Sequence, residues 1–175
     1  MGQQVITLGG GCFWCLEAVY ELVDGVAAVE NGYCNGQVPN PSYEAVCTGT
    51  TGHAEVVRVT FDDSISLREV LEIFFTIHDP TSLNRQGNDA GTQYRSGIYV
   101  NDAAQEAVAR EVLDEANVAH GGRVVTELLR VASYTRAEAY HQHYFANHPH
   151  QGYCAAVVAP KVEKFRKTFK TRVKV

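Results

Sequence analysis

The segment LGGGCFWC, residues 8–15, places three glycines and two aromatic rings around Cys12 and Cys15. The apolar residues 5–8 predict a short buried strand, and residues 16–23 predict a helix with one apolar stripe. A cysteine at this strand-to-helix turn lies at a helix N-terminus, where free backbone N–H groups and the helix dipole stabilise a thiolate. We therefore predict that Cys12 is a nucleophile with a lowered pKa. The alternative is that Cys12 is a small hydrophobic side chain of the core.

Glu55 is a candidate proton donor. Residues 54–61, AEVVRVTF, alternate as a strand does, and this alternation puts Glu55 on the face that carries Val57 and Val59. If that face is buried, desolvation raises the pKa of the carboxyl and keeps it a neutral acid that can donate a proton. Two alternatives remain open: this end of the strand is solvated, or Glu55 pairs with an arginine.

Two long irregular segments carry further polar candidates. Residues 37–53 contain two prolines and show little periodicity, and residues 78–96 are 19 positions without a pattern. Loops of this length inside a compact domain are usually functional. The first contains Tyr43, and the second contains Asp89 and Tyr94.

The remaining sequence predicts the elements that position these residues. Further strands are expected at residues 26–36, 97–100 and 124–131, and further helices at residues 67–77 and 102–116. Ser66 and Glu69 form a capping box before the helix at residue 67. Thr135 and Glu138 form a second box, which predicts a last helix. The order through residue 100 is β-α-β-β-α-β, so we predict an α+β fold: a ferredoxin-like split β-α-β two-layer sandwich with a mixed sheet and added C-terminal elements.

Length and charge limit the classes of protein. A chain of 175 residues with 45% hydrophobic content predicts a single domain, 1–175. The formal net charge of -5 gives no electrostatic reason to expect nucleic acid or a membrane as partner. Residues 161–175 form a basic tail, which we expect to be partly helical and to dock through Val162, Phe165 and Phe169. Neither a signal peptide nor a membrane span is encoded, so we expect a cytoplasmic protein.

The cysteines point to reactive thiols rather than to a structural framework. Their odd number and the expected compartment argue against a set of structural disulfides. A zinc site is disfavoured because Cys34 and Cys47 lack the paired C-x-x-C spacing of a second knuckle. We expect no metal and no cofactor. The five cysteines are Cys12, Cys15, Cys34, Cys47 and Cys154.

Four motifs carry a family resemblance: GCFW, NPSYEAVCTGTTGHAEVV, DPTSLNRQGNDAGTQYRSGIYV and HQHYF…GYC. Together they make residues 5–165 similar to the A class of peptide methionine sulfoxide reductases. The resemblance implies that Cys12 attacks the sulfur of methionine-S-sulfoxide, free or in proteins, while Glu55 acts as general acid. It also implies a set of substrate-binding residues: Phe13, Trp14, Tyr43, Asp89 and Tyr94.

The same resemblance implies how the cycle closes. A sulfenic acid left on Cys12 condenses with a second thiol to form an intramolecular disulfide. Cys154 in the segment QGYC corresponds to the resolving cysteine, with Cys15 and Cys34 as alternatives. Thioredoxin is the implied reductant, and we expect a monomer. A competing interpretation takes Cys12 and Cys15 as the C-x-x-C pair of a thioredoxin-like thiol-disulfide oxidoreductase.

Overall fold

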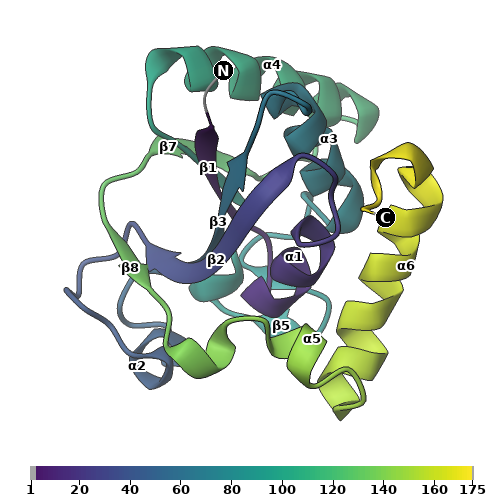
Figure 1. Cartoon of the computed structure of the whole chain (residues 1–175). Helices are drawn as coiled ribbons and strands as arrows, with labels where there is room; N and C mark the ends of the chain where they lie inside the picture. The colour runs from purple at the N-terminus through teal and green to yellow at the C-terminus, as the bar shows by residue number, and fades with distance from the viewer. Residues whose placement is uncertain (1–2, 175) are drawn as a thin grey trace.

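The computed structural model describes residues 3–174, which fold around a six-stranded mixed sheet (Figure 1). Its four central strands are β1 (Gln4–Gly9), β2 (Val26–Cys34), β3 (Ala54–Phe61) and β6 (Gly97–Val100). They lie in the order β6-β1-β3-β2, and each pairs antiparallel with its neighbour. This is the strand order of a ferredoxin-like split βαβ sheet, so the predicted fold class is confirmed.

Two outer strands and three helices complete the sandwich. β7 (Glu127–Arg130) runs parallel to β6, and β8 (Tyr134–Arg136) runs antiparallel to β2, which makes the sheet mixed, as predicted. Three helices connect the strands: α1 (Phe13–Tyr20) follows β1, α3 (Leu67–Ile77) follows β3, and α4 (Ala103–Ala119) follows β6. α3 begins with the predicted capping box of Ser66 and Glu69.

The main core lies between one face of the sheet and the helices. Along β3, Val57 and Val59 are fully buried while Arg58 is exposed, as the period-2 alternation of a strand requires. The Tyr20 hydroxyl of α1 donates to the Val70 carbonyl of α3 over 2.7 Å, and this bond ties the two helices together. A smaller cluster on the opposite face contains Cys34, Ala54, Val56 and Tyr99.

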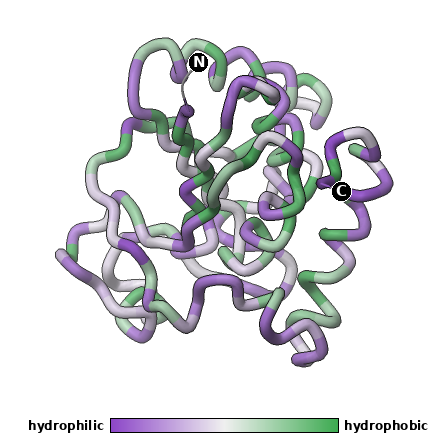
Figure 2. Tube along the Cα trace, viewed as in Figure 1, coloured by the Kyte–Doolittle hydropathy of each residue, from purple (hydrophilic) through white to green (hydrophobic). Residues whose placement is uncertain are grey.

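The basic C-terminal segment docks on the main core as expected. α6 (Ala159–Thr168) buries Val162 and Phe165, and Phe169 packs against the same core. Figure 2 shows hydrophobic and hydrophilic residues alternating along this helix, which matches an amphipathic element with one buried face. Arg172 fixes the end of the segment by an ion pair with Glu69.

The bounds of the first helix and the existence of the last predicted helix are wrong. The first helix begins at Phe13 and ends at Tyr20, earlier than the expected residues 16–23. The helix predicted from Thr135 and Glu138 does not form, because Thr135 pairs with Tyr33 in β8. The Glu138 carboxylate instead accepts a hydrogen bond from the Tyr33 hydroxyl over 2.8 Å. Strand pairing with β2 therefore overrides a local capping pattern.

The two long segments contain short structures that the sequence did not reveal. The first includes α2 (Tyr43–Cys47), whose N-cap Ser42 accepts a hydrogen bond from the Ala45 N–H. The second forms a small hairpin of β4 (Arg85–Gln86) and β5 (Asp89–Ala90), followed by the 3-10 turn η1 (Thr92–Tyr94). No helix within residues 3–174 is long and apolar enough to cross a bilayer.

Candidate active site

Cys12 lies at the end of the glycine turn that connects β1 to α1. Gly11 has a φ of 89°, a left-handed conformation that favours glycine. Its N–H donates to the Tyr94 carbonyl over 3.2 Å, which holds the turn against η1. Cys12 is the N-cap residue of α1, and only 7% of it is exposed. The turn thus places a nearly buried thiol at the helix N-terminus.

The environment of this thiol raises its pKa. Burial raises the pKa of Cys12 well above the ordinary value, and the negative charge of Glu55 raises it further. The nearby Trp14 N–H at the helix N-terminus lowers the pKa, but this effect is smaller. The prediction of a lowered pKa is therefore wrong for the free protein, because desolvation outweighs the helix terminus. Cys12 is therefore a neutral thiol at neutral pH.

Glu55 lies on β3, on the buried face that the alternation predicted, and none of its surface is exposed. Its Oε1 accepts a hydrogen bond from the Phe13 N–H over 3.2 Å, next to Cys12 in the chain. Among the described residues, Oε2 has no hydrogen-bond partner. Burial raises the pKa of the carboxyl to about 8, and the charge of Asp89 contributes. Glu55 is therefore a neutral acid at pH 7, with one oxygen free for an incoming group.

Aromatic rings surround the start of α1. Phe13 is fully buried, and its ring centroid lies 6.4 Å from that of Tyr43. The Trp14 ring stacks on Tyr144 at 3.9 Å, and its Nε1–H donates to Nδ1 of His141 over 3.2 Å. Both rings next to Cys12 are therefore held in fixed orientations.

Glu55 acts electrostatically on Tyr43 and Tyr94, the two phenols expected at the site. Tyr43 begins α2 and Tyr94 ends η1. The pKa of each is raised above the ordinary value, first by burial and then by the charge of Glu55. Glu138 fixes α2 by accepting the Tyr43 N–H over 2.9 Å. Both hydroxyls remain protonated donors near the carboxyl.

Asp89 joins the site through a residue that sequence reasoning missed. The Tyr153 hydroxyl donates a hydrogen bond to Oδ2 of Asp89. The same hydroxyl lowers the pKa of both the Cys12 and the Cys15 thiol, against the larger effect of burial. Tyr153 therefore links the hairpin, the start of α1 and the segment that carries Cys154.

The other cysteines differ in their relation to Cys12. Cys154 is fully buried at the start of the π-helical turn η3 (Cys154–Val158), and it shares the main core with Cys12 and Cys15. Cys34 lies in the cluster on the opposite face of the sheet, and Cys47 is exposed at the end of α2. All five thiols are free. The structure therefore separates Cys34 from Cys12 by the sheet, while Cys15 and Cys154 remain on its side.

His141 and Tyr144 are the other residues of this site to which sequence reasoning gave no role. Both lie within the HQHYF segment, which carried the family resemblance only as a whole. No periodicity in the sequence marks either position as part of a site. His141 belongs to the 3-10 turn η2 (Ala139–His141), and its ring lies 4.3 Å from that of Tyr43. Tyr144 begins α5 (Tyr144–Asn147).

One group of side chains has metal-ligand geometry. Ligand atoms of Glu17, Glu21 and His143 lie within 4.8 Å of one another. Hydrogen bonds within the group explain this closeness, since Glu17 accepts the His143 N–H over 2.7 Å and Glu21 contacts the His143 ring. The group packs α1 against the chain before α5 and lies outside the thiol site.

A thiol at a helix N-terminus, beside a neutral buried carboxyl and two protonated phenols, is the arrangement of a thiol-dependent oxidoreductase. Comparison with known proteins gives the family. The sequence profile of the peptide methionine sulfoxide reductase family matches residues 4–173. The chain is similar to the peptide methionine sulfoxide reductase MsrA of Polynucleobacter asymbioticus, with 57% identity over 170 residues that cover 95% of this chain and 90% of the relative. This chain belongs to the peptide methionine sulfoxide reductase family.

Solved structures agree with this assignment. Methionine sulfoxide reductase A of Corynebacterium diphtheriae has a TM-score of 0.81 and 38% identity, covering 89% of this chain and 79% of that one. Mxr1 of Saccharomyces cerevisiae in complex with Trx2 has a TM-score of 0.57 and 25% identity, covering 81% and 84%. The family resemblance drawn from the sequence is confirmed, and the thioredoxin-like alternative does not fit this family.

Proposed function

We propose that this protein repairs oxidative damage by reducing methionine-S-sulfoxide to methionine, with Cys12 as nucleophile and Glu55 as general acid. The observation that carries the proposal is the fully buried Glu55 carboxyl, whose pKa of about 8 keeps a proton beside the Cys12 thiol at neutral pH. A sulfoxide requires both groups, because its sulfur is attacked while its oxygen must be protonated.

The first step transfers one oxygen atom. The Cys12 sulfur attacks the sulfoxide sulfur while Glu55 gives its proton to the oxygen. The hydroxyl then passes from the substrate sulfur to the Cys12 sulfur, the sulfur–sulfur bond formed in the attack breaks, and methionine leaves, so Cys12 becomes a sulfenic acid. The proton lost by the Cys12 thiol restores the Glu55 acid, so the step consumes no net proton.

The remaining residues bind the two ends of the sulfoxide group. The Tyr43 and Tyr94 hydroxyls, whose pKa values are raised chiefly by burial, donate to the oxygen. The Phe13 and Trp14 rings contact the methyl group, and Asp89 holds Tyr153 beside the thiols.

The second step uses Cys154. Its thiol attacks the sulfenic acid sulfur, water leaves, and a Cys12–Cys154 disulfide forms. A thioredoxin dithiol then reduces this disulfide to two thiols. Two observations support the relay: both cysteines lie in one core cluster, and the solved structure of Mxr1 holds Trx2.

Turnover of a blocked methionine sulfoxide tests the proposed function. The protein is incubated with each sulfoxide epimer of N-acetylmethionine methylamide and dithiothreitol. We expect steady release of the thioether from the S epimer and none from the R epimer. Equal turnover of both epimers, or none of either, would refute the proposal.

Replacing Tyr43 or Tyr94 with phenylalanine removes one donor to the sulfoxide oxygen. We expect each single variant to lower the rate of the first step by about 10² or less, because the other phenol still donates. The double variant is expected to lose more than either single variant. Rapid-quench measurement of methionine in a single turnover gives these rates. A double variant no slower than the single variants contradicts a shared role.

Replacing Cys154 or Cys15 with serine separates the two possible partners of Cys12. The Cys154→Ser protein is expected to release one methionine per enzyme and then stop with thioredoxin as reductant, because its sulfenic acid is not resolved. The Cys15→Ser protein is the matched control and is expected to turn over nearly normally. The reverse pattern, with full cycling of Cys154→Ser, would assign the relay to Cys15.

A further inference from the structure

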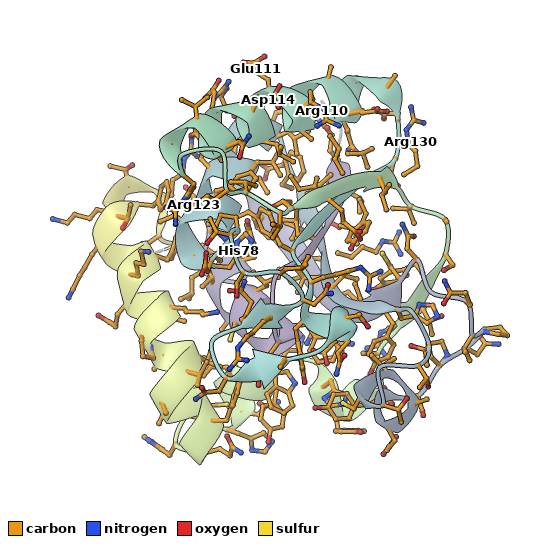
Figure 3. The ribbon with its side chains drawn as sticks, turned by 180° about the vertical axis from the view of Figure 1, so that it is seen from behind. His78, Arg110, Glu111, Asp114, Arg123 and Arg130 are labelled. Atoms are coloured by element: carbon orange, nitrogen blue, oxygen red, sulfur yellow. The ribbon has the colours of Figure 1, made fainter. Side chains whose placement is uncertain are left out.

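A groove of about 790 Å³ opens behind the thiol site, between α6, the end of α3 and the β4–β5 hairpin. Its lining includes the apolar side chains of Phe75, Val157 and Pro160. His78, which also lines the groove, is labelled in the view from behind (Figure 3). The volume suits several side chains of an extended peptide, because ligand sites usually measure about 300–1,000 Å³.

This groove adjoins the proposed substrate site through two shared residues. Asp89 and Tyr153 line the groove, and they hydrogen-bond each other. The Tyr153 hydroxyl also acts on the Cys12 thiol, whose pKa it lowers, so Tyr153 is common to the groove and to the surroundings of the nucleophile. A substrate polypeptide that places its methionine sulfoxide at Cys12 therefore has its neighbouring residues next to the groove.

The cations of the groove are gathered on its α6 wall. Lys161 and Lys164 line it from α6, and within residues 3–174 neither ammonium has an ion-pair partner. Two carboxylates also line the groove and keep their negative charge, Asp79 from the end of α3 and Asp89 from the hairpin. Each accepts a hydrogen bond from a neutral donor, Asp79 from the Thr81 N–H over 2.9 Å and Asp89 from the Tyr153 hydroxyl. The α6 wall thus presents two unpaired cations beside apolar side chains, while the carboxylates belong to the other two walls.

We propose that this groove binds the polypeptide that flanks a protein-bound methionine sulfoxide, and that it selects segments with an acidic residue beside apolar ones. The inference rests on the proposed function. Apolar side chains of the substrate pack on Phe75, Val157 and Pro160, while its carboxylate meets Lys161 and Lys164 on α6. Free methionine sulfoxide has no flanking residues and gains nothing from the groove.

The test compares two methionine sulfoxide peptides that differ only in flanking glutamate or lysine, with dithiothreitol as reductant. For the wild-type protein we expect kcat/KM to favour the acidic peptide about five- to tenfold, the worth of two exposed charge pairs. The Lys161→Glu/Lys164→Glu protein is expected to favour the basic peptide. Lys167→Glu/Lys170→Glu is the matched control, because it makes the same charge change outside the groove residues and should keep the wild-type preference.

Three outcomes would overturn the inference. The first is a wild-type preference near one, and the second is the same shift in both double variants, which would indicate net charge alone. The third is a loss in Lys161→Glu/Lys164→Glu seen with thioredoxin but not with dithiothreitol, which would assign the groove to the reductant. The blocked methionine sulfoxide separates this inference from the function, since activity on it fails only if the proposed function fails.

Discussion

Replacing Cys12 with serine is expected to abolish sulfoxide reduction with every substrate and every reductant. Cys12 is the N-cap residue of α1, and it directly precedes Phe13, whose N–H donates to Glu55. A serine hydroxyl is a far weaker nucleophile than a thiol, and no general base is available while Glu55 is protonated. Product analysis over several hours, with each epimer and with dithiothreitol or thioredoxin, measures the loss.

The same variant should remain folded. The Cys12 side chain makes no capping hydrogen bond, whereas serine is a favoured N-cap residue. We therefore expect the thermal midpoint of Cys12→Ser to be equal to or slightly above that of the wild type. Measurable turnover by a folded Cys12→Ser protein contradicts the assignment of the nucleophile.

Replacing Glu55 with glutamine is expected to lower the rate of the first step by about 10² to 10⁴, the usual contribution of a positioned general acid. The amide oxygen of glutamine can still accept the Phe13 N–H, so the start of α1 is retained. The amide cannot supply a proton to the sulfoxide oxygen. Rapid mixing with one equivalent of sulfoxide, followed by quantification of methionine, gives the rate.

The rate of the first step is expected to change with pH in opposite directions in the wild type and in Glu55→Gln. The wild-type step needs the Glu55 acid, so its rate is expected to fall as pH rises through about 8, the pKa of that carboxyl. In Glu55→Gln the charge that raises the pKa of Cys12 is gone, and the rate should rise as the thiol ionises. A wild-type rate that keeps rising above pH 8, or a variant within a few-fold of wild type, would show that the oxygen is protonated by another group.

Local patterns predicted much of this fold. The period-2 alternation along residues 54–61 matched β3, and the capping box at Ser66 matched the start of α3. Both succeed because the hydrogen bonds and the burial that decide them lie within one element. The second capping pattern, at Thr135, failed because pairing with β2 is a long-range interaction that no local pattern contains.

The site was predicted less completely. Burial of Glu55 followed from its strand face, but the raised pKa of Cys12 did not follow from its helix terminus. Desolvation depends on the aromatic and aliphatic neighbours that the whole fold assembles around the thiol. His141 and Tyr153 were missed for the same reason, since both reach the site from far along the chain, where a single histidine or tyrosine carries no local signal.

Mass mapping of one turnover without reductant tests the central claim most directly. The protein is mixed with excess S epimer of a blocked methionine sulfoxide, and its free thiols and disulfides are then mapped by proteolysis and mass spectrometry. The proposed chemistry predicts one methionine product per protein, loss of two of the five free thiols, and a single Cys12–Cys154 bridge. The R epimer should leave all thiols free. A Cys12–Cys15 bridge, or oxidation by the R epimer alone, would contradict the account.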